Sequence, residues 1–210
     1  PRARQWLSAA WRLTRTQFRT RDGSIVISRR VRRDLGQWEA ALLDKHSLGV
    51  PLASVADVAA VGAPGVGVIY ADASGNEGWC AWTIRDDDEL LITSGVWSDR
   101  ERLLGIAEKE LYASSAGLFT LAPLVNARDV YSFTDNMVAL AAMRTCAPRS
   151  LRLQELVRRR SADLEAAGLR EAAERVGSKS NLWADMGSRN DVCGVLAQAE
   201  ELGYVCSIVP

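Results

Sequence analysis

The sequence has few of the residues that build zinc sites and disulfide frameworks. It contains one histidine, His46, and four scattered cysteines, Cys80, Cys146, Cys193 and Cys206, with no C-x-x-C pair. A zinc centre needs several such ligands at short spacing, so this pattern argues against one. Scattered cysteines are typical of reduced intracellular proteins, in which they pack as small apolar side chains.

Long apolar runs are also missing. No stretch reaches the roughly 18 apolar residues of a membrane-spanning helix, and no signal-peptide pattern opens the chain. The composition is ordinary for a folded protein of 210 residues, with 48% hydrophobic and 25% charged residues. We therefore expect no membrane partner and a location in the cytoplasm or nucleus.

The net charge is zero, but the charges are unevenly distributed. Residues 1–33 contain ten arginines and one acid, Asp22, so this segment carries +9 and the rest of the chain carries −9. A basic arm ahead of an acidic body indicates a polyanion or an acidic neighbour as partner. A solvated charged helix is the plain alternative.

The pattern of apolar residues predicts a mixed α/β domain. Three strands in succession form an antiparallel meander, and two later strands, reached through helices, are expected to lie parallel to the first. The sheet then has five strands flanked by helices. The strands are predicted at Val66–Ala73, Gly78–Ile84, Leu90–Trp97, Val130–Thr134 and Glu171–Val176, and the helices at Arg102–Leu121, Asn136–Cys146, Ser150–Gly168 and Asn181–Arg189.

Three regions are expected along the chain. Residues 1–64 form a basic tether with helical spacing over residues 2–19 and around Leu35–Leu43, followed by a Gly/Pro-punctuated linker. Residues 65–192 hold the α/β domain. Residues 193–210 form a C-terminal extension, either a helix and a strand packed on the domain or a bridge to another one. The chain lacks an initial Met, so we expect it to begin inside a longer protein.

Two aspartates stand where two predicted strands end. Asp72 closes VGVIYADA, and Asp135 follows VYSFT. If these strands are parallel neighbours, both aspartates lie at the same sheet edge, where ligands bind in such folds. A lone aspartate at a strand end is more often a turn former or helix cap, but two in register favour a site.

Two further carboxylates can reach that edge. In the helix that carries EKELYASSAGL, a buried face through Leu111 and Ser114 places Glu110 beside the core and Lys109 toward water. A glutamate in that place is costly unless it is paired or bound to metal, although it can also snorkel outward. Asp185, in SNLWADMGSR, lies near the start of the last helix, where an acid also complements the helix dipole.

Three aspartates and one glutamate are hard oxygen ligands, which suit Mg²⁺ or Mn²⁺ better than zinc. Carboxylates gathered at one edge repel one another without cations. Two divalent ions about 4 Å apart can clamp the attacking and leaving oxygens of phosphoryl transfer. We therefore expect Asp72, Glu110, Asp135 and Asp185 to form a two-metal site.

Four motifs, YADAS, EKELYA, FTDN and NLWADMGSR, resemble in this order the ribonuclease H domain of reverse transcriptases. The likeness covers about residues 65–190 and is greatest to retrotransposons of the gypsy type and the tyrosine-recombinase (DIRS-like) type. Their A-D-x-x-S-R signature is matched by Ala184–Arg189. The upstream segment VISRRVRRDLGQWEAALLDKHSLGVPL is similar to the segment that joins polymerase to ribonuclease H in DIRS-like elements.

The resemblance implies a ribonuclease H-like fold and cleavage of the RNA strand of RNA–DNA hybrids with two Mg²⁺ (or Mn²⁺) ions. Asp72 would bridge both ions, Glu110 and Asp135 would hold one, and Asp185 the other. The polymerase part of the same polyprotein is the implied partner. Cellular members carry a histidine in the loop before the last aspartate, but here that loop reads VGSKSN, and His46 lies far upstream.

A nuclease must also hold a polyanion, and cations supply most of that affinity. Ser74, Gly75, Asn76 and Asn136 are expected at the sugar-phosphate backbone or the 2′-hydroxyl of RNA. Several arginines lie on or before the helix Ser150–Gly168, although a solvated helix face explains them equally well. The cationic candidates are Arg149, Arg152, Arg158, Arg159, Arg160, Lys179 and Arg189.

Two other function classes fit parts of the pattern. A non-catalytic module of the same fold would serve as a scaffold or nucleic-acid binder and would tolerate the loss of a carboxylate, yet all four are present. Transposase- or integrase-type nucleases usually carry a glutamate on the last helix and none on the first. Glu110 and Asp185 argue against that class.

Overall fold

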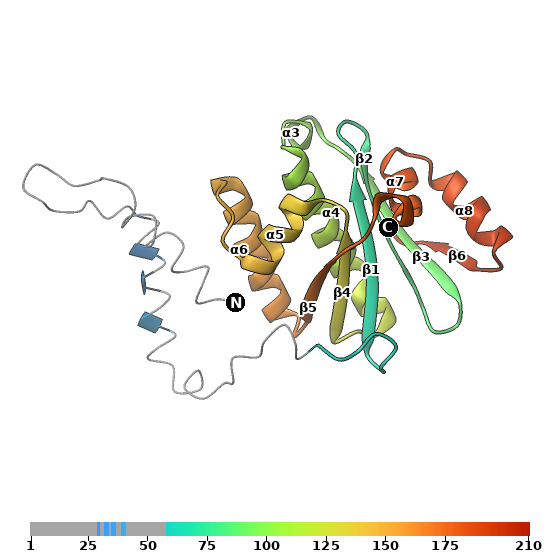
Figure 1. Ribbon diagram of the computed structural model, residues 1–210, viewed down its shortest axis with the longest axis horizontal. Coiled ribbons are helices and arrows are strands. Elements are labelled where there is room, and N and C mark those ends of the chain that lie inside the picture. Colours follow the sequence, from blue (N-terminus) through green and yellow to red (C-terminus); the bar gives the residue numbers. More distant parts are fainter. Residues whose placement is uncertain (1–28, 30–31, 34, 37–38, 41–57) are drawn as a thin grey trace, which may run out of the picture.

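The computed structural model describes residues 29, 32–33, 35–36, 39–40 and 58–210. Six strands form one mixed sheet in the order β5-β4-β1-β2-β3-β6 (Figure 1). The first three strands form an antiparallel meander, while β4 pairs in parallel with β1, β5 with β4, and β6 with β3. The strands are β1 (Val66–Ala73), β2 (Gly78–Ile84), β3 (Glu89–Val96), β4 (Asp129–Thr134), β5 (Arg170–Arg175) and β6 (Val205–Ile208).

Several helices begin where a side chain accepts hydrogen bonds from the first backbone amides. Asn136 Oδ1 accepts hydrogen bonds from the amides of Val138 and Ala139, and the Glu108 carboxylate accepts one from the Gly105 amide at 3.0 Å. The α-helices are α3 (Asp99–Arg102), α4 (Ile106–Leu121), α5 (Met137–Thr145), α6 (Leu151–Ala166), α7 (Leu182–Ser188) and α8 (Val192–Glu201), and two 3₁₀ turns cover Ala122–Val125 and Ser178–Ser180.

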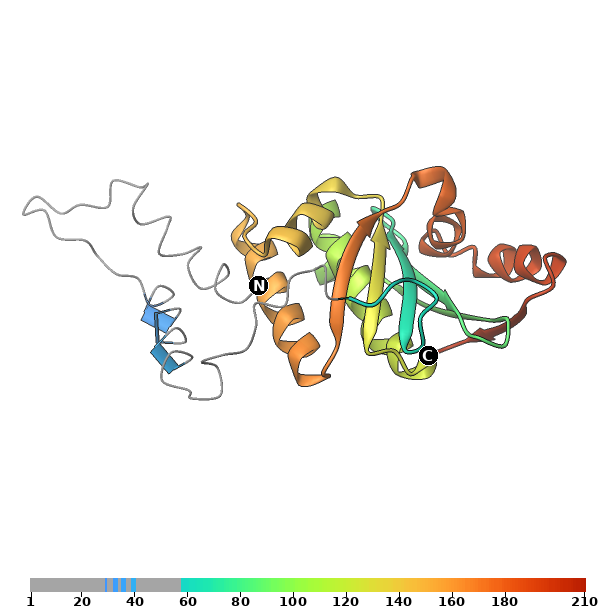
Figure 2. The same cartoon turned by 60° about the horizontal axis from the view of Figure 1, so that its bottom comes forward.

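The helices pack on the two faces of the sheet (Figure 2). Alternation along β2 separates the two cores, because Ala81 belongs to the cluster under α4 whereas Cys80 belongs to the cluster under α7 and α8. Helix α4 lies close to the sheet at Gly117, where an added Cβ would stand 2.2 Å from the Cβ of Ala81. This close approach fixes the helix that carries Glu110.

The mixed α/β fold class predicted from the sequence is confirmed, but two details were wrong. The sheet has six strands instead of five, because Val205–Ile208 pairs with the outer edge of β3. The helix expected over Arg102–Leu121 starts four residues later, at Ile106, because Arg102 is the last residue of a separate short helix, α3. The C-terminal residues are therefore a helix and a strand that pack on the domain.

The described residues before β1 add little to the fold. Those at positions 29, 32–33, 35–36 and 39–40 are helical, as expected around Leu35. The Ala59 amide donates to Asp129 Oδ2 at 3.0 Å, which fastens the chain to the start of β4. The helix expected over residues 2–19 and most of the linker lie outside the described residues. Within the described part of the chain, no helix is both long and apolar enough to cross a membrane.

Candidate active site

Three of the four predicted carboxylates lie together at one edge of the sheet. Tyr70 on β1 is in register with Phe133 on β4, so two residues further along Asp72 and Asp135 leave the sheet side by side. Glu110 reaches the same place from α4. One carboxylate oxygen from each of Asp72, Glu110 and Asp135 lies within 4.8 Å of the others. Asp72 and Glu110 are buried, and Asp135 is half-buried.

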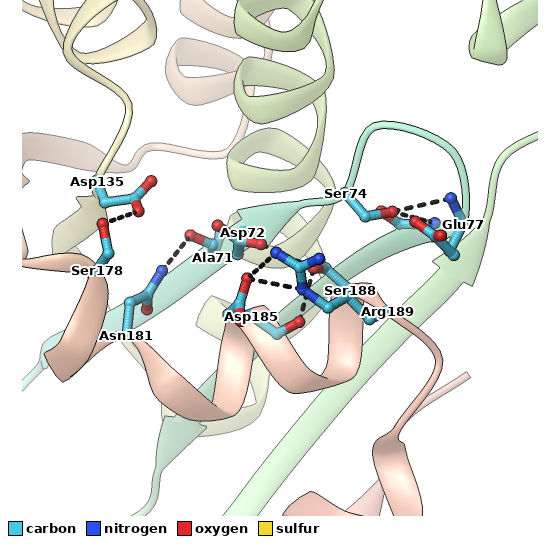
Figure 3. A network of polar contacts seen from close by, with 11 residues as sticks. Ala71, Asp72, Ser74, Glu77, Asp135, Ser178, Asn181, Asp185, Ser188 and Arg189 are labelled. Atoms are coloured by element: carbon cyan, nitrogen blue, oxygen red, sulfur yellow. Dashed lines mark hydrogen bonds and ion pairs between the residues drawn. The ribbon is translucent and has the colours of Figure 1, made fainter.

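The cluster is held by hydroxyl groups. Ser188 Oγ donates to Asp72 Oδ2 at 2.7 Å, Ser178 Oγ donates to Asp135 Oδ2 at 2.6 Å, and Thr134 Oγ1 lies 3.4 Å from Glu110 Oε2. Ser178 belongs to the loop VGSKSN that precedes α7, so this loop orients one carboxylate of the cluster (Figure 3).

Burial and mutual repulsion raise the pKa values of two carboxyl groups in the cluster, those of Glu110 and Asp72. Burial, followed by the charges of Asp72 and Asp135, raises the pKa of Glu110 to about 9. Burial also raises the pKa of Asp72 to about 6, although the hydrogen bond from Ser188 opposes the change. These shifts describe a protein without metal, and a bound cation would reverse their direction.

Asp185 lies beside this group on α7, and its charge helps to raise the pKa of Asp72. Its carboxylate is 42% exposed and accepts hydrogen bonds from Arg189 Nη2 at 2.8 Å and Nε at 3.0 Å (Figure 3). The structure therefore brings Asp72, Glu110 and Asp135 into one group and places Asp185 next to it, paired with an arginine.

Helix α7 is fastened to the strands that carry the cluster. Asn181 Nδ2 donates to the Ala71 carbonyl at 3.1 Å, and Ser188 donates to Asp72. Gly187 packs directly on β2, where an added Cβ would stand 2.4 Å from Cys80 Sγ. Sequence reasoning quoted all three residues within the motif NLWADMGSR but gave none of them a role, because none bears a charge.

The predicted nucleic-acid contacts differ in their exposure. Ser74 is buried, and its hydroxyl accepts hydrogen bonds from the amides of Glu77 and Gly78 at 2.9 and 2.8 Å, whereas Gly75 and Asn76 are exposed. Asn136 is half-buried and uses its side chain to cap α5. Ser74 and Asn136 therefore shape the backbone at the site edge.

The cationic candidates also separate. Arg149, Arg152, Arg159, Lys179 and Arg189 are exposed, and Arg158 is half-buried. Arg152 Nη1 lies 4.0 Å from Glu108 Oε2, which places the start of α6 beside the start of α4. The expectation for Arg160 was wrong, because its side chain is only 3% exposed and pairs with Glu171 inside the domain.

Comparison with known proteins identifies the fold. The sequence matches no family model and no curated protein sequence. LC11-RNase H1, solved in complex with an RNA/DNA hybrid, has a TM-score of 0.51 at 15% identity and covers 62% of this chain and 99% of its own. RNase H1 of the halophilic archaeon Halobacterium salinarum NRC-1 has a TM-score of 0.48 at 15% identity, and the match covers 62% of this chain and 99% of that one. The foamy virus protease-reverse transcriptase gives 0.39 at 13% identity, over 83% of this chain and 31% of that one.

At these identities the likeness establishes the architecture. The chain has the ribonuclease H-like fold, with the acidic cluster at the carboxyl ends of its parallel strands β1 and β4.

Proposed function

We propose that this protein is a metal-dependent endonuclease that hydrolyses the RNA strand of RNA–DNA hybrids. The observation that carries the proposal is the group of Asp72, Glu110 and Asp135, with one oxygen from each within 4.8 Å, at the ligand-binding edge of a ribonuclease H-like sheet. Rigid strands hold two of the carboxylates, and a helix packed on those strands holds the third.

The residues present fit divalent metal ions. All the donors are carboxylate oxygens, which are the ligands that Mg²⁺ and Mn²⁺ take. Hydroxyl groups donate hydrogen bonds to Asp72, Glu110 and Asp135. Among the described residues, no arginine or lysine forms an ion pair with any of the three. When bound, two such ions supply Lewis-acid activation and charge neutralisation for phosphoryl transfer.

The four carboxylates divide naturally between two ions. Asp72 interacts with each of the other carboxylates, because the charges of Asp135 and Asp185 help to raise its pKa and its own charge helps to raise the pKa of Glu110. Asp72 would therefore serve both ions, Glu110 and Asp135 the first, and Asp185 the second. Asp185 is exposed enough to exchange its arginine for another cation.

The chain's own residues would also hold the hybrid. Gly75 and Asn76 form an exposed turn that follows Asp72 by a few residues, where it can meet the sugar-phosphate backbone and the 2′-hydroxyl of the RNA strand. Exposed cations supply sequence-independent affinity for phosphates. We assign that role to the exposed Arg149, Arg152, Arg159, Lys179 and Arg189, and to the half-buried Arg158.

We place this activity within a reverse transcriptase of the gypsy or DIRS-like type. The four ordered motifs and the basic segment before the domain support this placement. The partner would then be the polymerase part of the same polyprotein, in the cytoplasm or nucleus.

The test is cleavage of a labelled RNA–DNA hybrid by the full chain with Mg²⁺ or Mn²⁺. We expect only the RNA strand to be cut, and EDTA and Asp135→Asn to abolish cutting. Asp87→Asn is the matched control, because Asp87 lies in the exposed β2–β3 turn at the opposite sheet edge. A hybrid that is bound but not cut with either metal would overturn the nuclease and favour a scaffold of the same fold.

A further inference from the structure

Lys109 on α4 is buried, contrary to the prediction that it points to water. The residue is only 3% exposed. Its ammonium group donates to the carbonyls of Gly75 and, at 3.0 Å, Arg102, and lies 5.8 Å from the centre of the Trp97 ring. Helical phase alone gave the wrong answer, because α3 and the turn between β1 and β2 fold over the first turn of α4.

The contacts of Lys109 indicate that its ammonium group holds neighbouring segments of the chain in place. Burying an ammonium group is costly unless it is satisfied by hydrogen bonds or charges. Among the described residues, Lys109 forms no salt bridge, and its partners are two carbonyl oxygens and an aromatic ring. One carbonyl closes α3, and the other belongs to the turn. The side chain therefore joins α4 to both segments.

The turn that Lys109 holds is Ser74–Glu77, which follows the metal-ligand candidate Asp72. Trp97 fixes the same turn from the other side, because its indole Nε1 donates to the Ser74 carbonyl and its amide donates to the Glu77 carbonyl, both at 3.0 Å. The hydroxyl of Ser74 closes the turn from within (Figure 3). Lys109 adds a hydrogen bond to the exposed residue Gly75.

We propose that Lys109 is a positioning residue that clamps the Ser74–Glu77 turn to α4, so that the turn presents a fixed surface to the RNA strand. This inference rests on the proposed function. Glu110 follows Lys109 directly, so the same helix turn holds a ligand of the acidic cluster and the segment that meets the substrate backbone. The turn that meets the RNA strand and the carboxylate of Glu110 are thereby held by the same rigid unit, the first turns of α4.

The test compares Lys109→Met with wild type in two measurements. Amide hydrogen exchange of the metal-free, nucleic-acid-free protein should be faster by about tenfold at Glu77 and Gly78, because two carbonyls lose their buried donor. With hybrid and Mg²⁺, KM should rise by about tenfold while kcat changes by less than about threefold. Val157→Ala, a core change on α6, controls for general destabilisation.

Trp97→Phe is the second variant, because it keeps the ring beside Lys109 but removes the indole donor to Ser74. It should loosen the same amides and raise KM in the same direction. Unchanged exchange at Glu77 and Gly78 in both variants would overturn the clamp. Faster exchange with unchanged KM would overturn the contact with substrate. If wild type cuts no hybrid, the proposed function fails, whereas the exchange result still decides whether Lys109 holds the turn.

Discussion

Helix α4 contributes to two buried polar regions that treat charge in opposite ways. In its first half, Glu110 joins Asp72 and Asp135, and each of the three accepts a hydrogen bond from a hydroxyl group. One turn further, Ser114 and Ser115 accept hydrogen bonds from the guanidinium of Arg160 at 3.0 and 2.6 Å. Arg160 also pairs with Glu171, through Nε at 3.0 Å and through Nη2.

The two regions therefore have opposite electrostatics. Burial alone would raise the pKa of Glu171, but the charge and hydrogen bonds of Arg160 outweigh it and leave the pKa lowered. Burial raises the pKa of Glu110 to about 9, because no such cation is at hand. A buried carboxylate with its own arginine serves the fold, whereas a buried group of carboxylates without one is suited to an external cation.

The largest effect should come from breaking the buried ion pair between Arg160 and Glu171. Arg160→Met leaves Glu171 buried and unpaired, and it should lower the free energy of unfolding by about 3–5 kcal/mol in urea titrations. The double variant Arg160→Met with Glu171→Met should recover most of this loss. A single variant that loses less than about 1 kcal/mol would show that the pair contributes no more than a surface ion pair.

Adding a divalent cation should stabilise the acidic cluster of Asp72, Glu110 and Asp135, which, within the described part of the chain, has no arginine partner of the kind that Glu171 has. Mg²⁺ or Mn²⁺ at about 100 times its dissociation constant should stabilise the folded chain by about 2.7 kcal/mol, which raises Tm in thermal unfolding. Asp135→Asn should abolish the shift, and Asp87→Asn should keep it. An equal shift in both variants would place the metal elsewhere.

The pH dependence of the metal-free protein should reveal the uncompensated cluster. The pKa of Glu110 is about 9 in the folded state, against an ordinary value of 4.5, so between these values the folded state holds a proton that the unfolded state has lost. The free energy of unfolding should then fall as pH rises, by about 4 kcal/mol between pH 5 and pH 8 in EDTA. Glu110→Gln should flatten this slope. An equally steep slope in that variant would assign it to other groups.

The smallest effect should come from the hydroxyl that orients the cluster. Ser178→Ala removes the hydrogen bond to Asp135 at an exposed loop. We expect metal affinity to weaken about tenfold by calorimetry, while the free energy of unfolding changes by less than about 0.5 kcal/mol. Ser180→Ala, two residues further in the same loop, is the control. Unchanged affinity would show that β4 alone orients Asp135.

The sequence was informative wherever a regular element dictates position. Asp72 and Asp135 could be placed together because both follow apolar strands that were expected to be parallel, and Glu110 because helical phase puts it beside a buried face. Those rules rest on fixed geometry. The roles of these carboxylates and of Asp185 in catalysis stay predictions.

The sequence was uninformative wherever position depends on contacts between distant segments. The strand Val205–Ile208 has only four residues, and it pairs with β3 across more than a hundred positions, which local pattern cannot reveal. Lys109 was expected to point to water and Arg160 to contact phosphate, because charge is the usual sign of exposure. Each is buried by segments that fold over its helix, and each finds its partners there.

Because Gly187 packs on Cys80, the rate at which the Cys80 thiol is alkylated reports how often α7 separates from β2. Cys80 is 1% exposed, and burial raises the pKa of its thiol to about 12, so an alkylating reagent reaches it only after the helix leaves β2. The exposed Cys193 reacts without that delay and supplies an internal standard. The ratio of the two labelling rates therefore measures how often the helix that bears Asp185 separates from the strand beneath it.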